Sequence, residues 1–500
     1  MATRFSWTGG LDRSLLQQLD LTAAVDAEAS YAPPYLPPSP WRPALSDRSE
    51  EVARLFAGQF RTAHSIEVAE ILQVAKRGGG LRPVAAVEFG ACVLYRALCD
   101  VVRPNLPTLD RSFSRKQELE RAPLEAAGCE YVVIGDVASF YDLVDHGLLV
   151  EEIVAQSGEA EVAETLGAFL QALMGRSFSL PQVLEPSDLL SEAYIDVAER
   201  SLLRGGFDVW RFNDDFWIAA RSWREANDAV EALHHDLRRI GLILNEGKTR
   251  PLSVDLYRQW LEEPEARWTQ INEEAQVDLR GVSIYDGEEG VVAAEVLPHD
   301  VYIGAAEHAL ELALSGEQEV DRLQEEVNRQ LIVAALAVLE FVESPAGIDY
   351  VKRIVAHAPH ITHRVGRYLM SVAPAAQGDV VALVDDLRED AGTYVSEWQA
   401  TWLFEPLRHV DELPGPTRDW VAGYVSAASD FVRGCASLLL AEKSLIGADE
   451  LAETYGTVRR AARADVVWAI ARGVPAEHRL VRAVQDDDAF QRWIVESARE

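Results

Sequence analysis

The spacing of apolar residues changes along this chain at about residue 320. Upstream, residues 46–75 have helical spacing, and strand-like and helix-like patterns then alternate between residues 130 and 255. The apolar, β-branched run at 131–137 predicts a buried strand, and residues 223–240 have the period of an amphipathic helix. Downstream, helical patterns follow one another with Pro, Gly or Ser between them. This order predicts an α+β fold, in which an α/β region is followed by an all-α region of HEAT-like helix pairs.

Two apolar runs, 207–212 and 216–220, flank a turn that contains Asp214 and Asp215. Asn and Asp favour turns, so these runs predict a β-hairpin with adjacent acids at its tip. Asp136 lies near the end of the preceding predicted strand. If both elements belong to one sheet, three carboxylates converge, and this is the set that two Mg²⁺ ions need in phosphoryl transfer. The acid pair alone also fits an ordinary turn, so the choice depends on the rest of the chain.

Charge is distributed unevenly along the chain. The formal net charge is −34, and residues 261–500 carry 43 acidic and 21 basic side chains, whereas residues 1–130 carry 16 and 15. A strongly acidic surface repels bulk nucleic acid, so we do not expect non-specific polyanion binding. The near-neutral N-terminal part leaves room for a local basic channel.

Cysteine usage and the N-terminus predict the compartment. The four cysteines form no CxxC pair, and the first residues lack the apolar core of a secretory signal. The sequence contains no apolar run long enough to cross a membrane. We therefore expect a cytoplasmic protein without disulfides, structural zinc or membrane contact.

Five segments in a fixed order resemble the motifs of reverse transcriptases, over roughly residues 60–255. In chain order they are Lys76 with Leu81-Arg82-Pro83 (fingers), DVASFY at 136–141 (motif A), SLPQVLEPSDLL at 179–190 (motif B), RFNDD at 211–215 (motif C) and GLILNEGKT at 241–249 (motif D). Each motif alone is weak, but their order and separation are specific. The resemblance implies a right-hand polymerase fingers-palm domain followed by an all-α HEAT-like repeat domain.

The expected domain boundaries follow from this resemblance. Residues 1–45 form an N-terminal arm that contains a Pro-rich stretch, and residues 46–255 form the fingers and palm. Residues 256–320 are a transition or thumb-like segment, and residues 321–500 form the HEAT-like domain.

The resemblance implies two-metal catalysis. Asp136, Asp214 and Asp215 are expected to hold two Mg²⁺ ions, with Mn²⁺ as a substitute and Val137 as a further metal-ligating position. The family's second Asp often lies further from the ions, which makes Asp215 the more distant ligand. Lys248 is expected to donate a proton to the leaving pyrophosphate, and a surface lysine is its alternative interpretation.

The resemblance also implies a nucleotide site. Arg82 and Lys76 are expected to hold the triphosphate of the incoming dNTP. Tyr141 is expected to exclude a 2′-OH by its bulk, and Gln182 to contact the nascent pair. A core tyrosine and a solvated loop lysine are the alternatives for Tyr141 and Lys76. Val183 departs from the family pattern, because this position usually holds a glycine, whose backbone freedom a β-branched residue lacks.

The acidic helical region resembles that of bacterial abortive-infection and defence-associated reverse transcriptases, the so-called unknown groups. This implies DNA synthesis in anti-phage defence, in some relatives without a template and primed from a protein tyrosine, and homo-oligomers in several. A DNA product attached to a tyrosine is then expected. The candidate priming residues are Tyr350, Tyr368, Tyr394, Tyr424 and Tyr455.

Two other functions remain open. One is a conventional RNA-templated reverse transcriptase that uses a cellular or co-encoded noncoding RNA. The other is a scaffold that kept the fold without activity, against which the complete set of three acids argues. Val183 and the acidic helical region favour template-independent synthesis over the first alternative.

Overall fold

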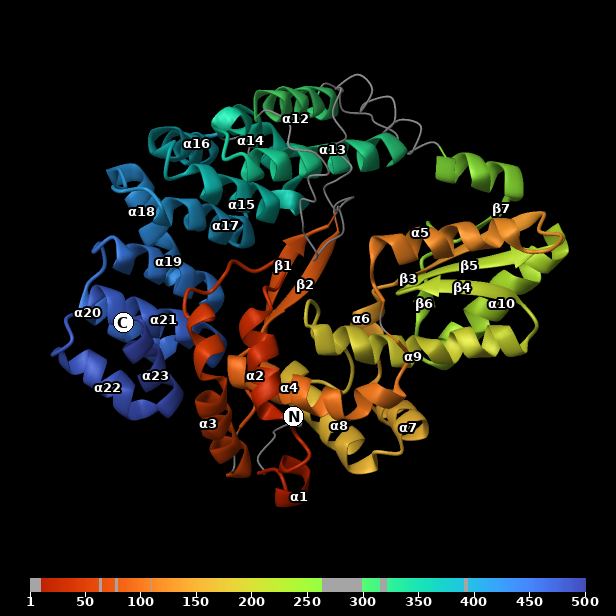
Figure 1. Cartoon of the computed structure of the whole chain (residues 1–500), viewed down its shortest axis with the longest axis horizontal. Helices are drawn as coiled ribbons and strands as arrows, with labels where there is room; N and C mark the ends of the chain where they lie inside the picture. The colour runs from red at the N-terminus through yellow and green to blue at the C-terminus, as the bar shows by residue number, and fades with distance from the viewer. Residues whose placement is uncertain are drawn as a thin grey trace. The chain divides into compact units, whose positions relative to one another are not determined.

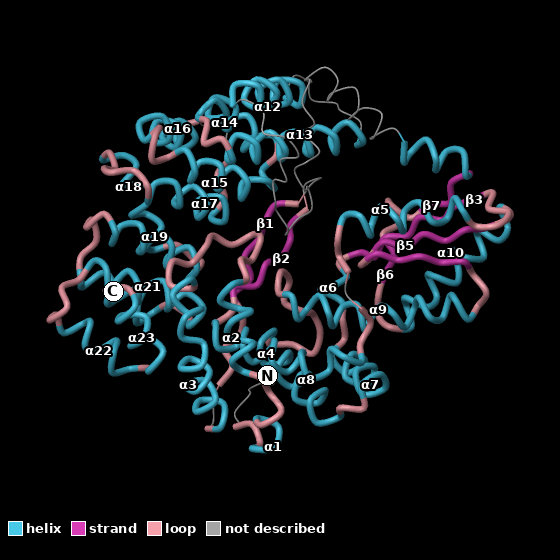
Figure 2. The backbone as a smooth tube through the Cα atoms, in the orientation of Figure 1, coloured by secondary structure: helices cyan, strands magenta, loops and turns pink. Residues whose placement is uncertain are grey.

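The computed structural model describes residues 10–62, 65–76, 80–108, 110–262, 299–314, 322–390 and 394–500. In these residues the chain is mostly helical, with two small antiparallel sheets (Figure 1, Figure 2). The described residues form two compact units. The first contains residues 10–28, most of 56–69 and the described residues of 89–262, and the second contains the rest. The predicted α+β character is confirmed at this level, because the α/β sheet region precedes an all-helical region.

A five-stranded antiparallel sheet forms the centre of the first unit. Its strands are β3 (Tyr131–Ala138), β4 (Asp208–Phe212), β5 (Asp215–Ala220), β6 (Ile243–Leu244) and β7 (Arg250–Ser253). The strand order is β4-β5-β3-β6, and β7 also pairs with β3. The predicted strand at 131–137 and the predicted hairpin are confirmed, and Val132 and Val133 of β3 are fully buried.

Helices pack on both the sheet and one another in this unit. They are α1 (Arg13–Leu16), α4 (Phe89–Val102), α5 (Phe113–Arg121), α6 (Phe140–Leu143), α7 (His146–Ser157), α8 (Ala160–Met174), α9 (Glu185–Arg204) and α10 (Trp223–Arg239). The predicted amphipathic helix is α10, which packs on β3 and β5, while α5 and α9 pack on β4. A Cβ at Gly135 would lie 2.7 Å from Leu233 Cδ2, so this glycine allows the close approach of α10 to β3.

The boundary between the two units falls near the end of α2 (Leu21–Ser30) and within α3 (Ser49–Arg61). The helical spacing at 46–75 predicts too much helix, because Glu70–Ala75 is strand β1. This strand pairs in antiparallel register with β2 (Leu81–Ala86), and both belong to the second unit. Pairing with a neighbouring strand therefore overrides the local helical period here.

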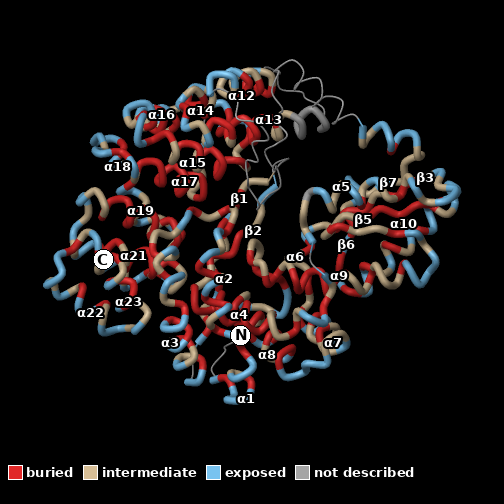
Figure 3. Tube along the Cα trace, viewed as in Figure 1, coloured by how far each residue is buried: buried red, intermediate tan, exposed pale blue. Residues whose placement is uncertain are grey.

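The second unit is built from consecutive helices. They are α12 (His299–Leu314), α13 (Arg322–Phe341), α14 (Ile348–His357), α15 (Thr362–Val372), α16 (Gln377–Glu389), α17 (Glu397–Arg408), α18 (Gly415–Gly423), α19 (Asp430–Glu442), α20 (Ala448–Thr457), α21 (Arg460–Gly473), α22 (Arg479–Asp487) and α23 (Ala489–Ser497). From α13 to α23 each odd-numbered helix packs against the next odd-numbered one. Among the even-numbered helices, α14 packs against α16, and α16 packs against α18. The helices α15 and α17 are buried over most of their length (Figure 3). The assignment of these helices to a HEAT-like repeat stays a prediction.

The Pro-rich stretch packs on helices of the second unit. The indole N–H groups of Trp398 and Trp402 donate to the carbonyl of Tyr35, at 2.7 and 3.2 Å. The indole of Trp41 donates to Asp465 Oδ1 at 2.8 Å. The aromatic residues between the prolines are therefore buried contacts of this unit.

Two further expectations concern the segment 256–320 and membrane-spanning helices. The expected transition at 256–320 lies largely outside the described residues, so only its two ends are placed. Among the helices that the structure describes, none is long and apolar enough to span a bilayer.

Candidate active site

The structure places the three predicted acids at one end of the sheet. Asp136 on β3 stands opposite Asp215 on β5 in the antiparallel register. Asp214 lies in the turn just before β5, and its carbonyl accepts a 3.1 Å hydrogen bond from the amide of Val137. The residue before it, Asn213, has φ +53°, a left-handed conformation that Asn tolerates better than most residues. The hairpin turn and the end of β3 thus bring the three carboxylates together.

Burial and neighbouring charges alter the protonation of two of these acids, Asp214 and Asp215. Burial, followed by the charges of Asp215 and Asp136, raises the pKa of Asp214 to about 6. Burial also raises the pKa of Asp215, and Lys116 opposes that rise. The site therefore concentrates more negative charge than its surroundings neutralise, which is the condition under which a divalent cation stabilises carboxylates.

Two lysines approach the acids. Lys248 Nζ donates to Asp136 Oδ1 at 2.7 Å, and Lys116 Nζ lies 3.6 Å from Asp215 Oδ2. The backbone supports the first contact, because the amide of Asn245 donates to the carbonyl of Asp136 at 2.7 Å. Lys248 was predicted for this site, and the structure brings it there. Lys116 was not predicted; it extends from α5, an element with no motif of its own.

The donor set fits magnesium in chemical type. Within the part of the chain that the structure describes, no group of three or more His, Cys, Asp or Glu side chains has the arrangement of a preformed metal site. Mg²⁺ is usually bound by one or two carboxylates together with substrate phosphates and water, and not by an all-protein cage. Oxygen ligands and the raised pKa of Asp214 fit such a shared site. Lys248 contacts only Oδ1 of the Asp136 carboxylate.

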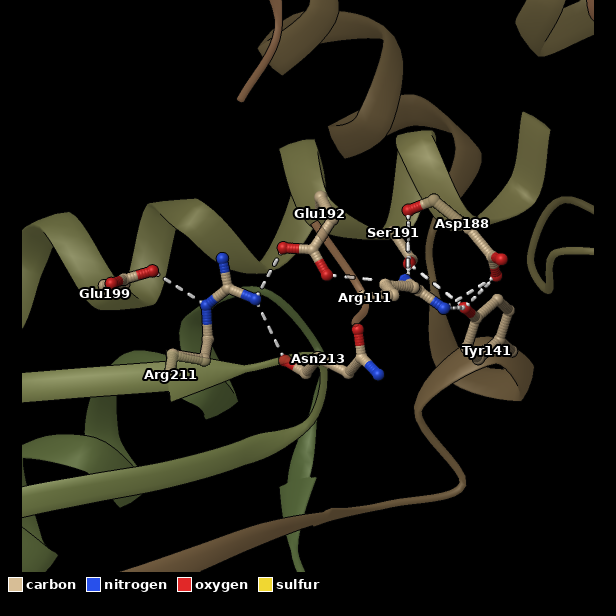
Figure 4. A network of polar contacts seen from close by, with 8 residues as sticks. All are labelled: Arg111, Tyr141, Asp188, Ser191, Glu192, Glu199, Arg211 and Asn213. Atoms are coloured by element: carbon tan, nitrogen blue, oxygen red, sulfur yellow. Dashed lines mark hydrogen bonds and ion pairs between the residues drawn. The ribbon is translucent and has the colours of Figure 1, made fainter. Parts of the chain in front are cut away.

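The predicted sugar-contacting residue, Tyr141, has its hydroxyl held from two sides (Figure 4). It donates to Asp188 Oδ1 at 2.5 Å and accepts from Arg111 Nη1 at 3.0 Å. Burial and the charge of Asp188 raise the pKa of Tyr141. The backbone is also fixed, because the amide of Leu180 donates to the Tyr141 carbonyl at 2.8 Å. Tyr141 is therefore a neutral, positioned phenol in contact with α9.

The motif B loop precedes α9 and has an unusual backbone. Ser179 has φ +86° and Val183 has φ +64°, both in the left-handed region. A β-branched residue is expected to avoid this region, yet Val183 adopts a left-handed conformation that glycine adopts more readily. A β-branched residue there is strained, typically by about 1–3 kcal/mol. Gln182, the predicted contact to the nascent pair, lies half-buried in this loop.

The two predicted triphosphate ligands lie on the β1-β2 hairpin, within the second unit. The amide of Lys76 donates to the carbonyl of Gly80 at 2.7 Å. Arg82 Nη1 donates to the hydroxyl of Tyr35 at 2.6 Å, and its guanidinium lies 4.6 Å from the centre of that ring. Arg82 is thus positioned by the Pro-rich stretch.

Sequence reasoning missed the side chains that hold this region from α9. Arg111 and Glu192 belong to no motif of the resemblance, and Arg211 had been considered only as part of motif C. One signal was present in the sequence: Asp188, Glu192 and Glu199 are four and seven residues apart, which places them on one helix face. That pattern is common on solvated helices, so it does not indicate arginine partners by itself.

Comparisons with known proteins give remote similarity. Neither a protein-family model nor a curated protein matches this chain. Among solved structures, apo telomerase from Candida tropicalis is similar with a TM-score of 0.31 and 10% identity, over 67% of this chain and 69% of that one. Telomerase from Candida albicans, in complex with the TWJ fragment of telomeric RNA, has a TM-score of 0.31 and 11% identity, over 72% and 66%. These scores are too low to argue from, so the functional assignment depends on the motifs and on the geometry of the carboxylates.

Proposed function

We propose that this protein is a DNA polymerase of the reverse-transcriptase type, which joins dNTPs by two-metal nucleotidyl transfer. The observation that supports it most is the convergence of Asp136, Asp214 and Asp215, with Lys248 in contact with Asp136. Carboxylates at the ends of neighbouring strands can hold divalent ions against a triphosphate. The proposed class is an RNA-directed DNA polymerase or a related DNA nucleotidyltransferase.

The metal-binding roles follow from the ligand atoms. Asp136 and Asp214 would provide carboxylate oxygens, Asp215 would add negative charge beside them, and Val137 has only a backbone oxygen to offer. Bound Mg²⁺ or Mn²⁺ would supply Lewis-acid stabilisation of the attacking and leaving oxygens. The raised pKa of Asp214 supports this role, because a cation would relieve the repulsion that causes part of it.

Lys248 is proposed to act as general acid. Its side chain is 60% exposed and is bonded to Asp136 through a flexible four-carbon stem. Asp136 would help to hold the cation, and Lys248 beside it would donate a proton to the leaving pyrophosphate. On the substrate side, Arg82 and Lys76 are proposed to hold the triphosphate and Gln182 to contact the nascent pair.

Tyr141 is proposed to select deoxynucleotides. A fixed ring below the sugar would exclude a 2′-OH by steric contact, and the hydrogen bonds of its hydroxyl with Asp188, Arg111 and Ser191 restrict its movement. A mobile tyrosine would discriminate less, because it could move away from the ribose.

Template-independent, protein-primed synthesis is the version that we favour over RNA-templated synthesis. Val183 supports it, because a valine side chain projects where the family has none, on the loop that would face a template strand. The conventional alternative, with a cellular or co-encoded noncoding RNA as template, stays open to test.

Among the five candidate priming tyrosines, exposure favours Tyr394. It is 83% exposed, whereas Tyr368 is fully buried and donates to the carbonyl of Ser344 at 2.8 Å. The hydroxyl of Tyr455 donates to Asp487 at 2.5 Å. A priming hydroxyl must reach the catalytic site, so Tyr394 is our first candidate.

The test is incorporation of single labelled dNTPs by the purified protein with Mg²⁺ or Mn²⁺, with and without added RNA. We expect product without RNA, retained in the phenol phase until protease is added, and none with Asp214→Asn. Asp228→Asn, on the exposed side of α10, is the matched control and should stay active. Product only with RNA would favour the conventional alternative. No product from the active-control protein under any condition would contradict the proposed function.

The proposed biological role is anti-phage defence by a cytoplasmic homo-oligomer. This part of the proposal is supported by the sequence resemblance alone. Cells that carry the wild-type protein should restrict phage plating, and cells that carry Asp214→Asn should not. Equal plating on both would contradict a defence role that depends on synthesis.

A further inference from the structure

Three acids lie along one face of α9, in the first unit. Asp188, Glu192 and Glu199 are spaced by four and seven residues, and all three face the hairpin end of the sheet and the segment before α5 (Figure 4). Each forms an ion pair with an arginine from another part of the chain. The arginines are Arg111, from the segment before α5, and Arg211, from β4.

Glu192 contacts both arginines, one with each carboxylate oxygen. Its Oε1 lies 3.5 Å from Arg111 Nη2, and its Oε2 lies 2.8 Å from Arg211 Nη1. The side chains of Glu192 and Arg211 are 9% and 6% exposed, so water screens this pair weakly. Each of the other two acids pairs with only one of these arginines: Asp188 pairs with Arg111 at 2.9 Å, and Glu199 pairs with Arg211 at 2.8 Å.

The two arginines also contact two different parts of the proposed active site. Arg111 donates to the hydroxyl of Tyr141 at 3.0 Å. Arg211 Nη1 donates to the carbonyl of Asn213 at 3.0 Å, in the left-handed turn residue that precedes Asp214. A continuous chain of charged hydrogen bonds therefore joins the proposed sugar-selecting ring to the turn that carries a catalytic acid.

We propose that Glu192 is a positioning residue that couples sugar selection at Tyr141 to the placement of Asp214. The inference rests on the proposed polymerase function and extends it to a residue that touches neither substrate nor metal. Loss of the Glu192 charge releases one contact of each arginine, so the ring and the turn both gain freedom. Glu199 pairs with Arg211 and not with Arg111. Loss of the Glu199 charge therefore affects the turn before Asp214 and leaves the ring of Tyr141 in place.

The experiment compares Glu192→Gln with Glu199→Gln, two identical changes on one helix face. We measure kcat and KM for a dNTP and for the matching rNTP, with circular dichroism to confirm folding. Glu192→Gln should lower kcat for the dNTP by about tenfold and lower the dNTP-to-rNTP preference by about tenfold as well. Glu199→Gln should lower kcat and leave the preference unchanged. Glu192→Asp, which keeps the charge, should restore part of the preference.

The dNTP-to-rNTP preference distinguishes a loss of positioning from partial unfolding of the variant. An unfolded fraction lowers the rates for dNTP and rNTP by one factor, so their ratio does not move. If Glu192→Gln leaves the ratio unchanged, or if Glu199→Gln changes it equally, the coupling is wrong and the proposed polymerase function is untouched. A wild-type protein that incorporates no nucleotide would overturn the polymerase function and the coupling together.

Discussion

Two groups of three acids lie in the first unit, and their partners differ. The acids of α9, Asp188, Glu192 and Glu199, are paired with arginines. The acids at the sheet end are approached by lysines, at 2.7 Å for Asp136 and 3.6 Å for Asp215. Arginine forks hold carboxylates in fixed geometry, whereas a lysine is a point charge on a flexible stem.

This difference indicates which acids are structural and which are free to take a new partner. Burial and neighbouring acids raise the pKa of Asp214 to about 6, so its carboxylate lacks full compensation. A cation at the sheet end would compete with the flexible lysines at Asp136 and Asp215, whereas a cation at α9 would have to break charge-assisted hydrogen bonds to arginine. The same residue type thus serves two purposes within one fold.

Removal of Arg211 is expected to have the largest effect on stability. Arg211→Met leaves the buried Glu192 and the partly exposed Glu199 without their shared cation, and loss of one partner of a buried pair such as Arg211 and Glu192 costs about 3–5 kcal/mol. Lys116→Met, at the half-exposed partner of Asp215, should cost less than about 1 kcal/mol. Urea denaturation measures the difference, and hydrogen exchange along α9 locates it in the first unit. Equal losses would show that arginine and lysine partners do not differ as we infer.

The end of the sheet should show a pH dependence of its own. The pKa of Asp214 in the folded state, about 6, lies above its value in an unfolded chain, about 3.9. The folded state therefore binds more protons in this window, and stability falls as pH rises from about 4 to about 6. The loss is about 3 kcal/mol and should be smaller in Asp214→Asn, in which burial still raises the pKa of Asp215.

Metal addition gives the matching control for this pH effect. In metal-free buffer at pH 7 the carboxylates at the sheet end of the wild-type protein repel one another in full. Mg²⁺ should therefore raise the free energy of unfolding of the wild-type protein and leave that of Asp214→Asn nearly unchanged. Thermal denaturation with and without Mg²⁺ measures both. An equal response of the two proteins would argue against metal binding by this carboxylate.

The sequence was sufficient for elements whose pattern is local. The β-branched run of β3, the turn residues before Asp215 and the period of α10 each act over a few residues, and all three elements form as predicted. The convergence of Asp136 with the hairpin was expected on the condition that both elements belong to one sheet, and the pairing of β3 with β5 meets that condition. The helical prediction at 46–75 was wrong for Glu70–Ala75, because these residues form strand β1 by pairing with β2, and a local pattern does not reveal a partner strand.

Contacts between distant segments could not be predicted. Arg111 and Glu192 are 81 residues apart, and their approach depends on how the segment before α5 passes α9. Lys116 reaches Asp215 for the same reason, because α5 packs beside β4. No local pattern distinguishes these side chains from ordinary surface charges.

The smallest expected effect concerns the loop that leads into α9. Val183 has φ +64° and lies two residues before the start of α9. Val183→Gly should stabilise the protein by about 1 kcal/mol, because relief of the strain exceeds the entropy that glycine loses on folding. Val183→Ala removes the branch and keeps the Cβ, so its stability should lie between those of wild type and glycine. Thermal denaturation ranks the three proteins, and RNA-templated incorporation should rise in the same order if the side chain blocks a template. Destabilisation by glycine would show that valine packing outweighs the backbone strain.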